Sequence, residues 1–226
     1  MFGYTVRLAR ATEVDCLPEI ERLAARRFVP YLDRLEIPAE LLEGLTPVRF
    51  LRRAQAERRL WVALADSRAL EVRPGRDIES DAEPDAELDT QTMVVGFIVA
   101  KFLLGSCFVV ELDVHPDFGR RGIGSALVEA CCAGARSRGV RWVTLTTFRY
   151  IPWNIPFYEG LGFEVLPAEQ WPPEIRAIVE HEHRYGFATK HRAVMRRRAW
   201  RPAMPTPLSG RQQLGRQHGK DRRHGR

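Results

Sequence analysis

The chain has 226 residues, 45 % of them hydrophobic, which suits one globular domain with tails. Its formal charge of +6 belongs to the C-terminus, because ten of the 35 Lys and Arg residues but only one of the 29 Asp and Glu residues follow Met195. The rest of the chain carries about −3, so the basic isoelectric point gives little support for a nucleic-acid-binding domain.

The sequence also argues against export and membrane insertion. The opening "MFGYTVRLARATEVD" lacks the apolar core of a signal peptide. The long apolar stretch 93–114 is interrupted by Lys101 and by Gly105-Ser106, a pattern that predicts two strands and a turn. The cysteines have no metal-ligand spacing, and we expect buried free thiols in a cytoplasmic protein: Cys16, Cys107, Cys131 and Cys132.

The N-terminal third predicts a strand at 5–9 and then a helix capped by Thr12 or Asp15. "PAELLEGL" and "PVRFLRRAQAERR" indicate two more helical pieces, and "LWVALAD" indicates a strand. Residues 68–92 are acidic and poor in large apolar side chains, which predicts a long mobile loop.

The middle of the chain predicts a hairpin of strands 93–103 and 108–114, then a helix at 123–138 that stops at Gly139. Its apolar face would be formed by Ile123, Leu127, Cys131 and Ala135. Strand 140–148 would complete a right-handed strand–helix–strand unit.

The last third predicts alternating short elements. They are a helix at 154–160, a strand at 163–166, a helix at 172–185 and a strand at 191–197. The basic tail 201–226 has almost nothing to bury and should be disordered. We therefore expect a single α/β (α+β) domain over 1–200, with an antiparallel centre.

The stretch "DFGRRGIGSALVEACC", which starts at Asp117, places glycines and two arginines between a strand and a helix. Glycines let backbone N–H groups approach an anion, and the first turn of a helix favours phosphate. The stretch lacks the Gly-Lys-Ser/Thr of a nucleotide P-loop, and Leu127 stands where the dinucleotide fingerprint needs a third glycine. It suits a phosphorylated cofactor bound without metal, or else it is an ordinary glycine-containing turn.

A second stretch, "YIPWNIPFYEGLGFEVL", predicts a short helix capped by Asn154 and ended by Gly162. This helix carries Phe157 and Tyr158 on one turn. Tyr158 could face a neighbouring cleft, or it could be a core aromatic residue whose hydroxyl is hydrogen-bonded.

Taken together, "VVELDVHPDFGRRGIGSALVEAC" and "WNIPFYEGLGFEVL" resemble the GNAT superfamily of N-acetyltransferases. The resemblance covers residues 4–198 and is strongest over 109–166. It implies the GNAT fold: a mixed, mostly antiparallel central sheet of about six to seven strands flanked by helices and splayed between the fourth and fifth strands.

The resemblance also implies acetyl-CoA as co-substrate, held in the opening between the splayed strands without a metal. Backbone groups from Leu112 to Val114 would hold the acetyl group and pantetheine. Amides of the following residues would hold the pyrophosphate: Arg120, Arg121, Gly122, Ile123, Gly124 and Ser125. Asn154 would contact the cofactor arm and Phe157 its sulfur end. Gly119 departs from the family, which often has Gln or Arg there, and Arg120 and Arg121 could supply the missing charge.

For catalysis, the resemblance implies that Tyr158 protonates the departing thiolate or hydrogen-bonds to its sulfur. Glu111 is our candidate for the base that takes the amine proton, since it and Asp113 should face away from the main core. Glu111 could instead be a solvent-facing or substrate-orienting carboxylate. A backbone N–H near Val114 would polarise the carbonyl.

The predicted function is transfer of an acetyl group to a small-molecule or protein amine, by direct attack in a ternary complex. The alternative is a catalytically silent acyl-CoA sensor with the same fold. We expect no membrane partner and no nucleic-acid partner, unless the basic tail binds RNA. The sequence does not decide between a monomer and a homodimer. The acidic loop could steer cationic amines or simply be solvated.

Overall fold

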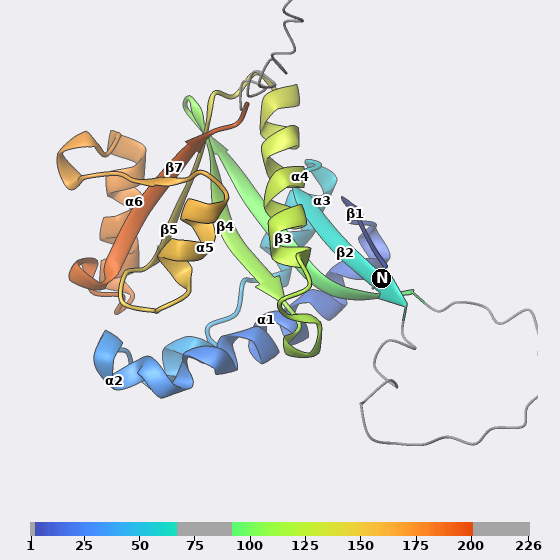
Figure 1. The fold of residues 1–226 in the computed structure, drawn as a ribbon, viewed down its shortest axis with the longest axis horizontal. Coiled ribbons are helices and arrows are strands. Elements are labelled where there is room, and N and C mark those ends of the chain that lie inside the picture. Colours follow the sequence, from blue (N-terminus) through green and yellow to red (C-terminus); the bar gives the residue numbers. More distant parts are fainter. Residues whose placement is uncertain (1–2, 67–91, 201–226) are drawn as a thin grey trace, which may run out of the picture.

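The computed structural model describes residues 3–66 and 92–200. These residues form one sheet in the order β1-β2-β3-β4-β5-β7-β6 (Figure 1). Its strands are β1 (Tyr4–Leu8), β2 (Leu60–Asp66), β3 (Thr92–Leu103), β4 (Ser106–Val114), β5 (Trp142–Phe148), β6 (Glu164–Val165) and β7 (Arg192–Arg198).

The sheet is mixed, as expected. Each neighbouring pair is antiparallel except β4 and β5, which are parallel. A parallel pair needs a crossover, and α4 (Ile123–Ser137) supplies it between these two strands. The predicted mixed sheet of about six to seven strands with flanking helices is confirmed, with seven strands.

Helices cover both faces of the sheet. The remaining α-helices are α1 (Leu17–Ala25), α2 (Leu32–Leu35), α3 (Val48–Ala56), α5 (Asn154–Gly160) and α6 (Pro173–Arg184). Helix α4 packs on one face, against β1 to β5, while α1 and α3 contact β3 on the other face. In Figure 1, α4 crosses in front of the sheet and α1 runs below the end of β4.

Two apolar clusters follow from this layering. The larger one joins α4 to the sheet and includes the four residues expected on its apolar face: Ile123, Leu127, Cys131 and Ala135. The second lies under α1 and α3 and includes Leu17, Ile20 and Leu51. The periodicity of the sequence was enough to predict the face that α4 buries, because a core-facing helix needs only one apolar stripe.

Some boundaries differ from expectation. Neither Thr12 nor Asp15 caps α1, because a 3-10 helix (Ala11–Cys16) precedes it and Cys16 is its N-cap. Cys16 is exposed, whereas the other three cysteines are buried free thiols, as predicted. The strand expected at 163–166 is reduced to Glu164–Val165.

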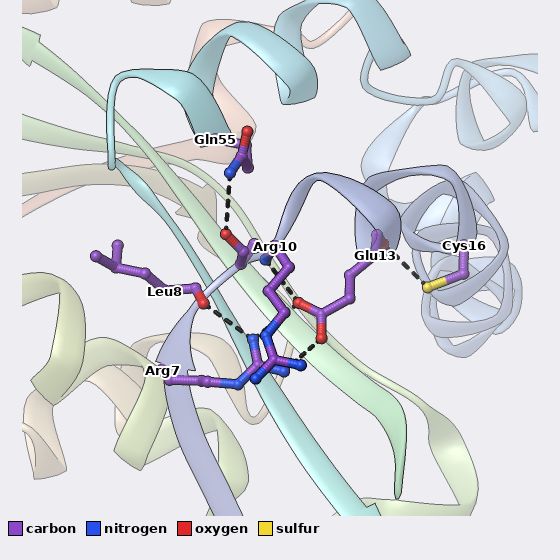
Figure 2. Close-up of polar contacts among 7 residues, drawn as sticks. Arg7, Leu8, Arg10, Glu13, Cys16 and Gln55 are labelled. Atoms are coloured by element: carbon purple, nitrogen blue, oxygen red, sulfur yellow. Dashed lines mark hydrogen bonds and ion pairs between the residues drawn. The ribbon is translucent and has the colours of Figure 1, made fainter. Parts of the chain in front are cut away.

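Side chains fix the path from β1 into α1 (Figure 2). The carboxylate of Glu13 accepts hydrogen bonds from the Arg7 guanidinium and, at 2.7 Å, from the backbone N–H of Arg10. Gln55 of α3 donates to the carbonyl of Ala9 at 3.2 Å. These contacts hold the start of α1 against the sheet, and thereby set which α1 side chains reach β4.

The acidic segment expected to be a mobile loop lies outside the described residues, except for Thr92, which starts β3; so does the basic tail at 201–226. Within the described ranges, none of the helices combines the length and the apolar character that a bilayer crossing requires.

Candidate functional site

The site begins where β4 and β5 part. Their recorded pairing runs from Ser106 with Trp142 to Val109 with Leu145. Strand β4 continues to Val114 and β5 to Phe148, and the two diverge in Figure 1. The β5-facing edge of β4 therefore has backbone groups beyond Val109 that no strand pairing uses. This confirms the predicted splay between the fourth and fifth strands.

A β-bulge lies at the same point. The register of β3 and β4 shifts between Val99 and Ala100: Val99 pairs with Glu111, but Ala100 pairs with Val109. Val110 is thus the extra residue of β4. A bulge bends a strand and re-aims its side chains, which is why such features recur beside functional sites.

The bulge decides which side chains of β4 face which layer. Val109, Leu112 and Val114 pack on the α4 side, in or against the larger apolar cluster. Val110 packs on the opposite side. Because of the bulge, the next residue, Glu111, lies on the same side as Val110, and so does Asp113. Both acids therefore face away from the main core, as expected. They do not face solvent, since Asp113 is buried and Glu111 is partly buried beneath α1.

The glycine turn leads from β4 into α4. Gly122 is the N-cap of α4 with φ +83, and Arg120 also takes a positive φ of +60. Arg120 and Arg121 are exposed. The first N–H groups of α4 lack intrahelical partners by geometry, so this turn can present amides and two positive charges to an anion.

Gly124 brings the helix start against the second motif. A Cβ on Gly124 would lie 3.3 Å from Cζ of Phe157 and 3.9 Å from Cγ2 of Val114. Gly124, Val114 and Phe157 thus meet in three dimensions, although Phe157 lies 43 positions after Val114 in the chain. Ile123 is buried beneath them, and Ser125 is partly buried on the first turn.

Helix α5 spans Asn154–Gly160, as predicted, and Gly162 follows it with φ +82. The expected cap is wrong in detail, because Trp153 is the N-cap and Asn154 is the first helical residue. Asn154 is buried, so its side chain points into the protein.

Tyr158 lies on α5 at the opening. Its ring packs edge-to-face on Phe157 at 4.9 Å and on Phe163 at 5.6 Å between ring centroids. Burial, and then the nearby carboxyls of Glu111 and Asp113, raise the pKa of its hydroxyl well above the ordinary value. The ring packs against the larger apolar cluster on the α4 side of the sheet, whereas the acids lie on the α1 side, and their charges act on the Tyr158 hydroxyl from there.

A third acid joins the pair. Glu21 of α1, Glu111 and Asp113 each place a carboxylate oxygen within 4.8 Å of one another, and we refer to these three residues as the carboxyl cluster. Burial, and then Glu21, raise the pKa of Glu111 to about 8. Burial, and then Glu111, raise the pKa of Asp113 well above its usual range, and burial raises that of Glu21.

Our sequence analysis missed Glu21. The buried stripe of α1 is Leu17, Ile20, Glu21 and Ala24, the i, i+3, i+4, i+7 spacing of a core-facing helix surface. An ionisable residue within such a stripe is rarely buried unless it has a partner or a function. That signal was available, but only the tertiary structure brings the stripe to Glu111.

Arginines border the cluster on two sides. Arg27 lies 4.3 Å above the ring of Trp153, and its charge acts on both Asp113 and Tyr158. On the opposite wall, Arg192 of β7 donates two hydrogen bonds to Glu182 at 2.9 and 3.0 Å and one to Thr146 at 2.8 Å.

The cluster also bears on the expectation of a metal-free protein. Its three carboxyls are a set of oxygen donors of the kind that divalent cations use. The absence of a metal therefore stays a prediction, to be tested together with the cluster.

A pocket of about 560 Å³ lies between the end of α1 and the turn after β4. It is lined by Leu23, Arg26, Arg27, His115, Pro116 and Asp117. Its two arginines outnumber its one acid, Asp117, which favours an anionic ligand there.

Comparisons with known proteins point to one family. A family model described as "Acetyltransferase (GNAT) domain" matches residues 86–165, the segment that contains β3 to β6 and both motifs. PaiA N-acetyltransferase from Thermoplasma acidophilum, solved in complex with coenzyme A, is 15 % identical; the match covers 87 % of this chain and 99 % of that one, with a TM-score of 0.55.

Two further structures are similar. An acetyltransferase of the GNAT family from Staphylococcus aureus Mu50 is 11 % identical over 88 % of this chain and 100 % of that chain, with a TM-score of 0.53. Ard1 from Thermoplasma volcanium is 17 % identical over 88 % and 99 %, with a TM-score of 0.51. At these identities the likeness concerns the fold.

Proposed function

Because this chain belongs to the GNAT superfamily of acetyltransferases, we propose that it transfers an acetyl group from acetyl-CoA to a primary amine. The amine would attack the thioester directly, in a ternary complex at the opening between β4 and β5. Three tasks follow: the amine must lose its proton, the carbonyl oxygen must be polarised, and the thiolate must be stabilised as it leaves.

The residues present fit acetyl-CoA as co-substrate. The amides of Arg120 to Ser125 and the charges of Arg120 and Arg121 suit its pyrophosphate. Backbone groups of Leu112 and Val114 lie on the free edge of β4, where they could hold the pantetheine and acetyl groups. Phe157 would line the sulfur end, and we retain Asn154 as a contact to the cofactor arm. When bound, the co-substrate supplies the activated acetyl group.

Glu111 has the pKa that a base for an alkylamine needs. An alkylammonium has a pKa of about 10, so an ordinary glutamate would take its proton with an equilibrium of about one in a million. With a pKa of about 8, Glu111 improves that ratio to about one in a hundred. Burial beside Glu21 therefore makes the Glu111 carboxylate a much better proton acceptor.

Tyr158 suits the stabilisation of the leaving sulfur. Its raised pKa keeps the hydroxyl protonated at all ordinary pH values, so it is a permanent hydrogen-bond donor. The same raised pKa disfavours full proton transfer to a thiolate, whose conjugate acid has a pKa of about 8.5. We therefore favour a hydrogen bond from Tyr158 to the sulfur over complete protonation.

Backbone N–H groups of β4 beyond the bulge are available to the acetyl carbonyl. A donor near Val114 would stabilise the oxyanion that forms during attack, a contribution of about 3 kcal/mol in enzymes of this general kind.

The observation that carries the proposal is that β4 and β5 part beyond Val109, with Glu111 on the part of β4 that β5 leaves unpaired and Phe157, the neighbour of Tyr158 on α5, against Gly124. A thiol-release assay with acetyl-CoA tests it, run against alkylamines, polyamines, aminoglycosides and N-terminal peptides. We expect release of coenzyme A that depends on one of these amines. Tight acetyl-CoA binding without release in the presence of any of them would favour the sensor function instead.

Other expectations remain part of this proposal. We infer a small-molecule or protein amine as the acceptor and a cytoplasmic location, and we assign no role to a membrane or, apart from the basic tail, to nucleic acid. A homodimer stays open.

A further inference from the structure

The carboxyl cluster gathers more carboxyl groups than a single base requires. Glu21 and Asp113 are each 8 % exposed, and each has a buried carboxylate oxygen, Oε2 and Oδ2, with no hydrogen-bond partner among the described residues. A buried polar atom without a hydrogen-bond partner is unfavourable, and more so if it is charged. Two such oxygens in one cluster are available to accept hydrogen bonds from a bound cation.

The carboxyl of Glu21 is held in place from behind. Its Oε1 accepts hydrogen bonds from the backbone N–H of Thr46 at 2.9 Å and from the Thr46 hydroxyl at 3.0 Å. One oxygen is thus committed to the protein, while the other remains available. A contact of this kind orients a side chain that would otherwise turn toward water.

The dimensions of the cluster suit a primary ammonium. An R–NH₃⁺ group has three N–H donors and no acceptor, and charge-assisted hydrogen bonds to carboxylates are about 2.8 Å long. Three acceptors around a tetrahedral nitrogen at that distance lie about 4.6 Å apart. The three carboxyls each offer one oxygen within 4.8 Å of the other two.

Other charges around the cluster leave the net excess negative. Arg27 acts on Asp113, and Arg192 acts on Glu111 but is bound to Glu182, which itself adds negative charge. Tyr158 faces the cluster as a neutral phenol. Like-charge repulsion would therefore weaken the binding of an acceptor that carries a carboxylate beside its amine.

We propose that the carboxyl cluster binds the protonated amine of the acceptor through three carboxylates, so that the enzyme selects alkylammonium acceptors with no anionic group next to the reacting nitrogen. The ammonium hydrogen-bonds to Glu21, Glu111 and Asp113. One of its protons then passes to Glu111, and the neutral nitrogen forms the C–N bond as the C–S bond breaks. A second proton leaves the nitrogen for the departing thiolate, which accepts a hydrogen bond from Tyr158 and is released as the thiol. The inference rests on the proposed function for the identity of the ligand as an acceptor.

The central experiment compares n-butylamine with two matched compounds. L-norvaline is n-butylamine with a carboxylate added to the carbon that bears the nitrogen. n-Butanol is the uncharged analogue of n-butylamine. Each is titrated by calorimetry at pH 7.5 into the full chain saturated with coenzyme A, which cannot react. We expect n-butylamine to bind at least 10-fold more tightly than L-norvaline and n-butanol. Equal binding of n-butylamine and L-norvaline would overturn the inference.

Glu21→Gln tests the cluster with a change of charge and almost none of shape. The amide oxygen can keep the contacts to Thr46, and loss of a buried charge should not destabilise the fold. We expect n-butylamine affinity to fall at least 10-fold and the preference over L-norvaline to shrink. Glu19→Gln is the matched control, because Glu19 is an exposed residue of the same helix and should leave binding unchanged.

A measurement on the unaltered protein keeps the test independent of any variant. Repeating the n-butylamine titration in two buffers of different ionisation enthalpy gives the protons exchanged. A cluster that gives up shared protons to accommodate an ammonium should release protons to the buffer, and binding without proton release would count against the inference.

The outcomes separate this inference from the proposed function. Binding of n-butylamine that depends on Glu21, without thiol release from acetyl-CoA, would leave the cation site standing and remove the acetyltransferase proposal. Thiol release with amines, together with n-butylamine binding that does not depend on Glu21, would support the acetyltransferase proposal and overturn the inference. Binding of magnesium or calcium chloride alone that displaces n-butylamine and is abolished by Glu21→Gln would replace the ammonium by a metal and overturn the inference.

Discussion

Two sides of the opening between β4 and β5 are built in different ways. The proposed cofactor side consists of the free edge of β4 and the turn from Gly119 to Ser125, and it would work largely through backbone groups of one continuous stretch. The proposed acceptor side is the carboxyl cluster, whose side chains come from α1 and β4, 90 residues apart between Glu21 and Glu111. Backbone recognition needs glycines and a helix start, whereas a buried charge cluster needs a tertiary fold to hold it. The following experiments separate the two sides.

The largest effect is expected for Tyr158→Phe, which acts where the two sides meet. The substitution removes the hydroxyl and keeps the ring contacts with Phe157 and Phe163. Turnover should fall about 10²–10³-fold, the usual range for loss of a hydrogen-bond donor that stabilises developing charge in the transition state. Steady-state kinetics and calorimetry measure turnover and acetyl-CoA affinity, and the latter should hardly change. Tyr185→Phe, at an exposed tyrosine, is the control; equal turnover in the two variants would exclude a role for the Tyr158 hydroxyl.

Glu111→Gln should affect the acceptor side alone. With n-butylamine, kcat/KM of the native protein should rise about tenfold per pH unit below pH 8, because the carboxyl must lose its proton to act as a base and its pKa is about 8. The variant should lose about 100-fold at pH 8. With hydroxylamine, which is neutral at pH 7 and needs no base to deprotonate it, the loss should be much smaller. A similar loss with both acceptors would argue that Glu111 does not take the proton.

Gly124→Val should affect the cofactor side alone. A Cβ there already lies 3.3 Å from Phe157, and two more methyl groups would overpack the contact by about 1–3 kcal/mol. We expect KM for acetyl-CoA to rise about 10-fold or more, with the amine preference unchanged. Gly160→Val is the control, because a Cβ at Gly160 meets no atom within 4 Å. A normal KM in Gly124→Val would show that this close approach does not serve the cofactor.

The carboxyl cluster should also make stability depend on pH. Unfolded glutamate has a pKa of about 4.3 and Glu111 in the fold one of about 8, so between these values the folded protein holds a proton that the unfolded chain has lost. The contribution of Glu111 to stability is complete below pH 4 and decreases as the pH rises toward 8. In thermal denaturation, the Tm of Glu111→Gln should therefore rise relative to the Tm of the native protein as the pH rises, by about 3 °C or more at pH 8. A difference in Tm that is independent of pH would contradict the raised pKa.

The smallest effect is expected for Arg120→Ala. Its exposed charge is screened by salt, so the dissociation constant for coenzyme A should rise only about 3–10-fold, and less at high salt. Arg58→Ala is a matched control, since Arg58 is also exposed and also has a positive φ, of +54. If both variants bind coenzyme A equally well, the Arg120 charge does not contribute.

The comparison of the two sides also explains which predictions from the sequence were successful. The strands, α4 and α5 were predicted within a few residues, because their apolar periods and glycine stops are local signals. The caps of α1 and α5 were wrong, since a preceding 3-10 helix or a tryptophan took the position that a polar side chain was expected to fill. Glu111 was proposed as the base from its place on a strand, and it stays a proposal. Its high pKa could not be predicted from the sequence, because that depends on burial beneath α1 and on Glu21.

The sequence by itself determined the layered fold and the cofactor turn, since strand alternation, the stripe of α4 and the spacing of glycines are all written within short segments. Only the tertiary structure decided where the chemistry lies. The bulge at Val110 turns Glu111 and Asp113 to one side, α1 brings Glu21 to them, and the parting of β4 and β5 lets Tyr158 reach all of this from the opposite layer. Charges interact through space and burial, which no short stretch of sequence specifies.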